Sequence, residues 1–182
     1  MKTCVFIIGT NCSGKSTLAR GLMAKFGGII TTDNKLTRCV DKRCAFAGKY
    51  DKKTAYGGVD TLNATAPLAA IVREGLQVSD VIVCEGSYLD TFGMNLTNAI
   101  FEARAQLVVF LYLGSAELQR RLKERSGGVV KDTIIKKQVR CLRCAEKWKS
   151  VGVPVMLIDT GKNNPDQVTE QVYNKIIKLI QQ

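Results

Sequence analysis

The most constraining feature of the sequence is a glycine-rich segment between an apolar run and an amphipathic stretch. The apolar run, Val5–Ile8, is of strand length, and Leu18, Leu22 and Phe26 follow the glycine-rich segment at helical spacing. The segment between them reads Gly9-Thr10-Asn11-Cys12-Ser13-Gly14-Lys15-Ser16. This is the complete G-x-x-x-x-G-K-[ST] phosphate-loop pattern in its strand–helix context. A glycine turn that binds nothing is the alternative, and the context argues against it.

Each residue type in this loop has a physical role in binding phosphate. The glycines allow close backbone approach, and the turn aims several N–H groups inward as an anion site. Lys15 supplies a charge for the β- and γ-phosphates, and Ser16 offers a hydroxyl to Mg²⁺. The sequence therefore predicts binding of a nucleoside triphosphate, taken to be ATP, with Mg²⁺. The predicted nucleotide-binding residues are Gly9, Thr10, Asn11, Cys12, Ser13, Gly14, Lys15, Ser16 and Thr17.

Apolar runs and helical stretches alternate along the rest of the chain, which favours an α/β fold. Alternation of this kind is typical of a parallel sheet with helices on both faces. We expect a single domain over residues 1–182. The predicted strands are 4–8, 29–32, 81–84, 107–113 and 153–158, and the predicted helices are 14–26, 67–77, 95–103, one from 115, 132–150 and 166–179. Residues 34–60 look irregular, and we expect a mobile substrate-side lobe with one short helix there.

The charge of the chain is unevenly placed. Lys and Arg number 27 against 16 acidic residues, a net charge of +11. Residues 33–60 carry seven basic and four acidic side chains, and residues 120–149 carry eleven and three, so the rest of the chain is neutral. A basic surface favours a polyanionic partner such as nucleic acid. Solvated helical faces and ATP-contacting arginines are the alternative for each segment.

The location of the protein is also predicted from composition. No apolar run approaches the length of a membrane span, and the N-terminus passes directly into the first predicted strand, which leaves no room for a signal peptide. Seven cysteines, an odd number, are scattered over predicted strands and helices. They are typical of reduced thiols, so we expect a cytoplasmic protein without a membrane partner.

Four features of the chain resemble the small P-loop kinases. They are the phosphate loop, Asp33 after the second predicted strand, Glu85 after the third, and the arginines of the helix from 115. This family includes adenylate, shikimate, gluconate and polynucleotide kinases. The resemblance implies a three-layer α/β/α fold with a five-stranded parallel sheet in the order 2-3-1-4-5. It also implies a helical lid, here about 115–150, and transfer of the γ-phosphoryl of ATP to an acceptor.

The resemblance assigns roles to individual residues. Lys15 would neutralise phosphate charge, and Arg121 or Arg125 would clamp the moving phosphoryl when the lid closes. The chain has no histidine, so Asp33 is the first candidate for a catalytic base, with a helix cap or a ligand of a magnesium-bound water as the alternative. Glu85 would bind Mg²⁺ through water or position substrate, or else bond the phosphate loop.

Four further features have weaker expectations. Arg38 would contact a substrate phosphate, as in polynucleotide kinases, or be a solvated lobe residue. Asp159 comes too late in the chain for a Mg²⁺ ligand, and the loop 160–163 after it would lie by the adenine. The pairs Cys39/Cys44 and Cys141/Cys144 suggest a structural zinc site only weakly, because nothing ties them together. Three apolar residues of the predicted helix 132–150 are expected in the core: Val139, Leu142 and Trp148.

The acceptor is the least constrained part of the prediction. The segment 48–60, with Gly48-Lys49-Tyr50 and Tyr56-Gly57-Gly58-Val59-Asp60, is similar to small bacteriophage P-loop proteins. Among them are kinases of 5-hydroxymethyluracil in DNA, which would place the protein in the cytoplasm of an infected host. This resemblance implies a DNA partner contacted through segments 33–60 and 120–149. A metabolite or nucleotide kinase, a polynucleotide 5′-end kinase and a nucleotide-dependent switch are the alternatives. ATP over GTP preference and oligomeric state stay open.

Overall fold

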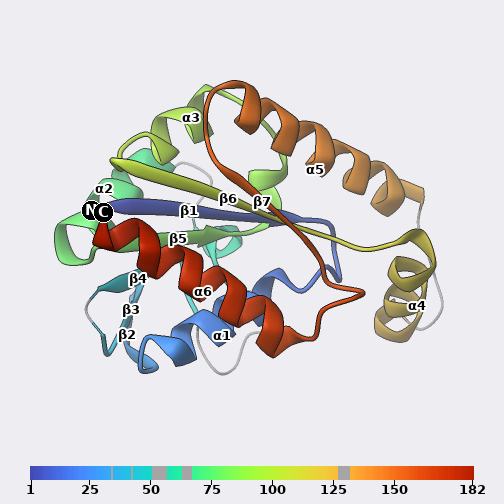
Figure 1. Ribbon diagram of the computed structural model, residues 1–182, viewed down its shortest axis with the longest axis horizontal. Coiled ribbons are helices and arrows are strands. Elements are labelled where there is room, and N and C mark those ends of the chain that lie inside the picture. Colours follow the sequence, from blue (N-terminus) through green and yellow to red (C-terminus); the bar gives the residue numbers. More distant parts are fainter. Residues whose placement is uncertain (34, 42, 51–56, 63–66, 127–131) are drawn as a thin grey trace.

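The computed structural model describes residues 1–182 except 34, 42, 51–56, 63–66 and 127–131. One seven-stranded sheet lies between two layers of helices, as Figure 1 shows. The strands are β1 (Thr3–Gly9), β2 (Ile29–Thr32), β3 (Leu36–Cys39), β4 (Cys44–Ala47), β5 (Val81–Glu85), β6 (Ala105–Tyr112) and β7 (Val155–Asp159). The helices are α1 (Lys15–Lys25), α2 (Leu68–Val78), α3 (Met94–Ile100), α4 (Ser115–Ser126), α5 (Asp132–Ser150) and α6 (Pro165–Gln181), with 3₁₀ turns η1 (Val59–Thr61) and η2 (Ser87–Asp90).

The strand order is β2-β3-β4-β5-β1-β6-β7, and β1 lies between β5 and β6. Both neighbours run parallel to β1, with Ile7 opposite Glu85 and opposite Val109. The carboxyl ends of β1, β5 and β6 therefore meet at one edge of the sheet. In open α/β sheets this edge is where ligands bind.

The α/β fold predicted from the sequence is confirmed, but the sheet has seven strands and not five. The sheet is also not wholly parallel as predicted, because β3 runs antiparallel to β2 and to β4. The predicted order of the five strands holds, with β3 and β4 inserted between β2 and β5. Residues 34–60 were expected to be an irregular lobe, and this was wrong for the hairpin that β3 and β4 form. β4 is buried on both faces, so its residues Cys44–Ala47 do not alternate in polarity and gave no strand pattern.

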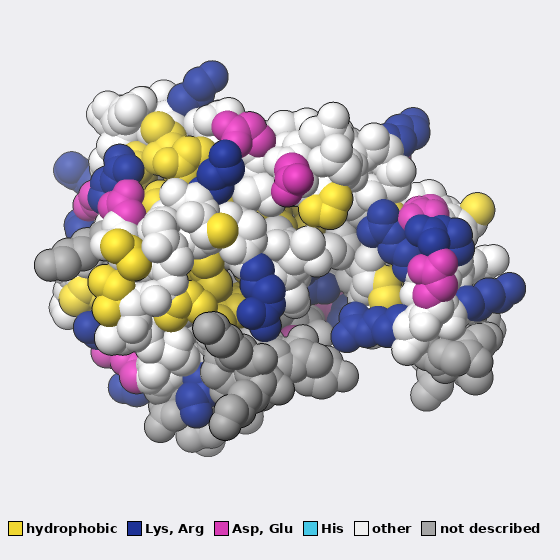
Figure 2. Space-filling view, turned by 90° about the horizontal axis from the view of Figure 1, so that it is seen from below, with side chains coloured by type: hydrophobic (Ala, Val, Ile, Leu, Met, Phe, Trp, Pro, Cys, Tyr) yellow, Lys and Arg dark blue, Asp and Glu magenta, His cyan; other side chains and the backbone are white. Residues whose placement is uncertain are grey.

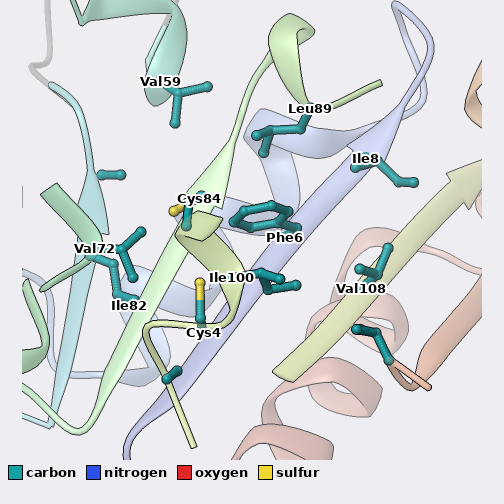
Figure 3. Close-up of a cluster of buried hydrophobic side chains, with 14 of the residues drawn as sticks. Cys4, Phe6, Ile8, Val59, Val72, Ile82, Cys84, Leu89, Ile100 and Val108 are labelled. Carbon is teal, nitrogen blue, oxygen red and sulfur yellow. The ribbon is translucent and has the colours of Figure 1, made fainter. Parts of the chain in front are cut away.

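Two hydrophobic clusters cover the two faces of the sheet. Alternate residues of β1 enter different clusters, with Phe6 in one and Val5 and Ile7 in the other. The first cluster is covered by α2, α3 and α5, and the second by α1 and α6. Figure 3 shows Phe6 in the first cluster together with Leu89 and Ile100. Because β1 is buried on both sides, its position in the sheet is fixed, and so is the phosphate loop that follows it.

The two helices of the expected lid region differ in how they are held. α5 contributes Trp148 and the thiols of Cys141 and Cys144 to the first cluster, and burial raises the pKa of each thiol to about 11. α4 rests on a separate small cluster whose fully buried members are Leu113, Leu118 and Leu122. Of these two helices, α5 therefore packs into the main core, and α4 packs outside it.

The expectation for the apolar residues of α5 was right for Trp148 and wrong for two others. Trp148 is completely buried, whereas Val139 and Leu142 are 47% and 43% exposed. They lie on the outer face of the helix because the buried face is formed by Cys141, Cys144, Ala145 and Trp148. Within the described part of the chain, no helix combines the length and the apolarity needed to cross a membrane.

Trp148 is the first position to test, because its ring meets Phe6 and Phe92 edge-on, at centroid distances of 5.9 and 4.7 Å. Trp148→Ala should lower the free energy of unfolding by about 3–5 kcal/mol, since it opens a cavity in the main core. Leu157→Ala, at a position 46% exposed on β7, should cost much less. Urea unfolding followed by circular dichroism measures both, and equal losses would contradict the assigned core.

Candidate active site

The phosphate loop has the backbone geometry that anion binding requires. Gly9 ends β1 with φ +153°, and a Cβ there would lie 2.5 Å from the Leu111 carbonyl oxygen. Gly14 adopts a left-handed conformation just before α1. The N-terminus of α1 has no side-chain cap and no acidic residue in its first turn. Its N–H groups and its dipole are thus available to an anion.

Lys15 folds back over this loop. Its ammonium donates hydrogen bonds to the carbonyl oxygens of Gly9 at 2.9 Å and Thr10 at 3.0 Å. Burial lowers the pKa of Lys15 below its usual value, while the charge of Glu85 acts in the opposite direction. The ammonium therefore lies at the mouth of the loop, where phosphate oxygens would replace the two carbonyls.

Glu85, the last residue of β5, brings a carboxylate to the same place. Its side chain is 2% exposed, and its Oε1 accepts a hydrogen bond from the Ser16 hydroxyl at 3.4 Å. Burial raises the pKa of Glu85, although the Lys15 ammonium opposes this shift. The Tyr50 hydroxyl is buried beside the carboxylate without a regular hydrogen bond, and burial and the Glu85 charge raise its pKa well above normal.

Magnesium prefers oxygen ligands, and Ser16 and Glu85 together supply a hydroxyl and a carboxylate beside the phosphate loop. This donor set fits the ion that the sequence predicts. Within the described residues there is no group of three or more histidine, cysteine or acidic side chains that could form a separate metal site. The pairs Cys39/Cys44 and Cys141/Cys144 lie in different clusters, on opposite faces of the sheet.

Asp60 is a second carboxylate of the cleft, and sequence analysis did not assign it a role. It lies in η1, and its two oxygens accept hydrogen bonds from the Ser87 N–H at 2.8 and 2.9 Å. Gly58 lets η1 pack against the end of β5, because its φ is +72° and a Cβ there would lie 2.2 Å from the Glu85 carbonyl oxygen. The glycines before Asp60 were the available signal in the sequence.

One cleft of about 750 Å³ unites these groups. The described residues that line it are Asn11, Cys12, Gly14, Lys15, Ser16, Thr17, Gly57, Asp60, Glu85, Ser87, Arg121, Leu122, Glu124, Arg125 and Ile134. Figure 2 shows the hollow between the main body and the projecting part that carries α4, where Lys and Arg side chains gather. The cleft thus has the phosphate loop at its base, the carboxylates of Asp60 and Glu85 beside it, and Arg121, Glu124 and Arg125 from α4.

The structure places Asp33 outside this set of lining residues. Its carboxylate accepts hydrogen bonds from the N–H groups of Lys35 and Leu36, both at 2.7 Å, in the turn between β2 and β3. Partial burial raises the pKa of Asp33, but these hydrogen bonds and the charge of Arg38 outweigh it and lower the pKa overall. β3 and β4 separate β2 from β5. Asp33 was expected beside the phosphates, but its carboxylate instead binds backbone N–H groups of the turn between β2 and β3.

Arg38 also lies away from the cleft. It lines a smaller cavity of about 230 Å³ together with Cys39, Cys44 and Val78. Two other described basic residues of the segment 33–60 are held in surface ion pairs: Lys35 pairs with Glu74, and Arg43 pairs with Asp41. Lys42, Lys52 and Lys53 lie outside the described residues.

The lid arginines are placed as expected next to the phosphate loop. Arg121 is held by Glu117 at 2.7 Å, and it donates to the carbonyl oxygens of Thr160 at 2.7 Å and Cys12 at 3.5 Å. Hydrogen bonds from Arg120 and Arg121 lower the pKa of Glu117 to about 2. Arg125 is exposed and lines the cleft.

The loop after β7 packs against the phosphate loop. The Thr160 hydroxyl donates to the Ser13 carbonyl oxygen at 3.0 Å. Thr160, Asn163 and Arg121 line a pocket of about 80 Å³ that borders the phosphate loop. Asp159 instead accepts a hydrogen bond from the Gly161 N–H at 2.9 Å, which is a turn contact. The loop 160–163 therefore borders the phosphate loop, and its contact with adenine stays a prediction.

The raised pKa of Glu85 predicts a stability change with a defined sign. Burial penalises its ionised form, so wild-type stability declines as pH rises from the ordinary Glu pKa of about 4.3 through the higher folded-state value. Glu85→Gln should therefore gain in free energy of unfolding, relative to wild type, at neutral pH and not at pH 3.5.

Glu102→Gln is the control of opposite sign. The hydrogen bond from Arg73 lowers the pKa of Glu102, so this variant should lose stability at neutral pH and lose nothing when the carboxyl is protonated. Denaturant unfolding across this pH range measures both variants. Shifts of the same sign would contradict the assigned environments.

No protein-family model matches the sequence, and no curated protein matches it. Solved structures do match it over nearly the whole chain. A YorR protein from Bacillus subtilis, in complex with phosphorylated GDP, has a TM-score of 0.60 at 15% identity, covering 97% of this chain and 96% of that chain.

Two further structures are similar over the same extent. A gluconokinase from Sinorhizobium meliloti 1021 has a TM-score of 0.56 at 16% identity, covering 99% of this chain and 94% of that chain. A sugar kinase from Janibacter sp. HTCC2649 has a TM-score of 0.52 at 15% identity, covering 99% and 98%. At these identities the similarity shows the fold alone, which this chain shares with the solved gluconokinase and sugar kinase.

Proposed function

We propose that the protein is an ATP- and Mg²⁺-dependent kinase that phosphorylates a hydroxyl group on a nucleic-acid substrate. One observation carries the kinase assignment. The Lys15 ammonium and the uncapped N-terminus of α1 face the same cleft as the carboxylates of Glu85 and Asp60. A cationic phosphate cradle opposite two carboxylates suits transfer of a phosphoryl group to an acceptor.

In this proposal the chain contributes mainly positioning and charge. Lys15 and the N–H groups of the loop would hold the β- and γ-phosphates. Ser16 and Glu85 would hold the magnesium ion, which would supply neutralisation of phosphate charge. Arg121 and Arg125 approach the transferred group from α4. The small cluster under α4 makes that helix the moving part of the lid, while α5 stays with the body of the protein.

Asp60 is the better placed candidate for the catalytic base. Sequence analysis gave this role to Asp33, whose oxygens are engaged in a turn and whose pKa is lowered. Asp60 lines the cleft and is oriented by the Ser87 N–H. Its carboxylate retains further lone pairs, so it can accept a proton from an acceptor hydroxyl that enters beside Glu85.

We propose 5-hydroxymethyluracil in DNA as the acceptor. The resemblance of the segment 48–60 to bacteriophage kinases supports it, and this segment includes Gly57 and Asp60, which line the cleft. The hydroxymethyl group is a primary alcohol, which a carboxylate base can activate. A base in duplex DNA must leave the stack to reach the cleft, and contacts to the DNA backbone would offset that cost of a few kcal/mol.

A small-molecule kinase is the second candidate. The similarity to a gluconokinase and a sugar kinase over nearly the whole chain favours it, and the complex of the YorR protein with phosphorylated GDP favours a nucleotide acceptor within this class. A polynucleotide 5′-end kinase would use the same cleft on DNA ends.

The acceptor class is tested by labelling with γ-labelled ATP. Label should enter DNA that contains 5-hydroxymethyluracil and not the matched thymine DNA, because the methyl group of thymine offers no hydroxyl. Separate pools of nucleosides, nucleotides and sugars complete the set. Label in both DNAs would indicate an end kinase, and label only in a small-molecule pool would indicate a metabolite or nucleotide kinase.

Lys15→Ala is the negative control for every pool, and it should abolish transfer because it removes the phosphate-binding charge. Lys25→Ala is its matched control. Lys25 lies at the other end of α1 and pairs with Glu170 on the surface, so transfer should persist. Transfer by Lys15→Ala at the wild-type rate would contradict the kinase proposal.

The choice between two carboxylates is tested by Asp60→Asn and Asp33→Asn. Asparagine keeps size and most hydrogen bonding but removes basicity, so Asp60→Asn should lower kcat by about 10²–10⁴-fold with nucleotide affinity little changed. Asp33→Asn should leave kcat within a few-fold of wild type. A large fall in kcat for Asp33→Asn and none for Asp60→Asn would return the base role to Asp33.

A further inference from the structure

We infer that the outer face of α5 is a nucleic-acid track that leads away from the cleft. This rests on the proposed function, since it assigns the surface that would hold a polymeric acceptor. Four basic residues of α5 define the track, here called the basic stripe: Lys136, Arg140, Arg143 and Lys147. Their spacing of four, three and four residues puts them on one side of the helix.

All four side chains of the basic stripe are exposed. Lys136 and Arg143 have no acidic partner within the part of the chain that the structure describes. α4 shows the contrasting pattern of a solvated face, where Arg120 pairs with Glu117 and Glu124. Like charges three or four residues apart destabilise a helix, so an anionic partner that relieves the repulsion would bind there favourably.

The basic stripe is connected to the cleft through η2. Arg140 donates to the buried Asp90 carboxylate at 2.6 Å, and Lys137 approaches the same carboxylate at 3.4 Å. η2 begins at Ser87, which lines the cleft and binds Asp60. At the end of the basic stripe far from the cleft, the Lys147 ammonium lies 5.9 Å from the centre of the Phe92 ring. The segment from Ser87 to Phe92 therefore runs along α5 from the cleft outward.

Exposed apolar side chains flank the same path. Tyr88 is 53% exposed and stands between Ser87 and Asp90 in η2, and Met94 is 78% exposed at the start of α3. An exposed aromatic ring beside cations is the combination that nucleic-acid-binding surfaces use, with the ring available to a base and the cations to the backbone.

The dimensions also suit a nucleic-acid backbone. The basic stripe spans eleven residue steps, or about 16 Å at about 1.5 Å per residue. That is about five phosphate steps along one strand of B-DNA, at about 3.4 Å each. Three of the four described basic residues of the segment 33–60 do not extend this surface, because Lys35 and Arg43 are paired and Arg38 lines the separate cavity.

The test is binding of a fluorescent 20-base-pair DNA duplex, without nucleotide, over a series of salt concentrations. Wild-type affinity should fall steeply with salt, because each phosphate contact releases counterions. The double variant Lys136→Gln/Arg143→Gln removes two cations that have no structural partner. Its log–log salt slope should be shallower by about 1.8, at about 0.9 per lost contact.

Lys175→Gln/Lys178→Gln is the matched control, with the same change in net charge on the exposed side of α6, which covers the opposite face of the sheet. Its slope should equal that of wild type. Equal slopes for all three proteins, equal losses in both double variants, or binding to anionic lipid vesicles in place of DNA would overturn the inference.

The inference and the proposed function fail separately. DNA binding is measured without phosphoryl transfer, so Lys15→Ala should still bind DNA with the wild-type slope if the track is correct. Lys136→Gln/Arg143→Gln should lower transfer to DNA through KM, with kcat unchanged. If the basic stripe binds DNA but the protein phosphorylates only small molecules, the DNA acceptor is rejected and the inferred DNA-binding surface still holds.

Discussion

The burial of the Glu85 carboxylate against Lys15 and Ser16 is the interaction on which the site depends. β1 and β5 are adjacent and in register, with Ile7 opposite Glu85, so the end of one strand and the loop after the other face each other. A buried carboxylate is costly unless it is hydrogen-bonded or paired with a charge. The Ser16 hydroxyl and the charge of Lys15 offset part of that cost, although burial still raises the pKa of Glu85. The resulting cluster couples the chemistry of the site to the pairing of two core strands.

The parts of the fold that the sequence predicts well are those with strong local patterns. The phosphate loop between β1 and α1 has a fixed spacing and a fixed context, and the helices with clear amphipathic faces were located within a few residues. The candidate residues on the loop, Glu85 and Arg121 are in the cleft because each is tied to an element whose position is set by β1, β5 or α4. In these cases the local sequence and the global fold agree.

The remaining parts depend on contacts that no local pattern reports. β3 and β4 have four residues each, and the two faces of β4 are both buried, so neither alternation nor length marked it as a strand. Because the sequence does not predict this hairpin, β2 was expected directly beside β5, and Asp33 was therefore expected beside the phosphates. No local pattern indicated Asp60 either, because its carboxylate is oriented by the Ser87 N–H, 27 residues away in sequence. Val139 and Leu142 were misplaced because an apolar residue on a helix can face either way.

α4 rests on three buried leucines, whereas α5 is part of the main core. The free energy needed to lift α4 is therefore largely separate from the free energy that holds the whole protein together. In the proposed lid motion, substitutions at Leu118 or Leu122 would change how often the arginines of α4 leave the cleft without weakening the sheet beneath. In evolution, the speed of opening and the durability of the protein could then be adjusted independently, by different sets of residues.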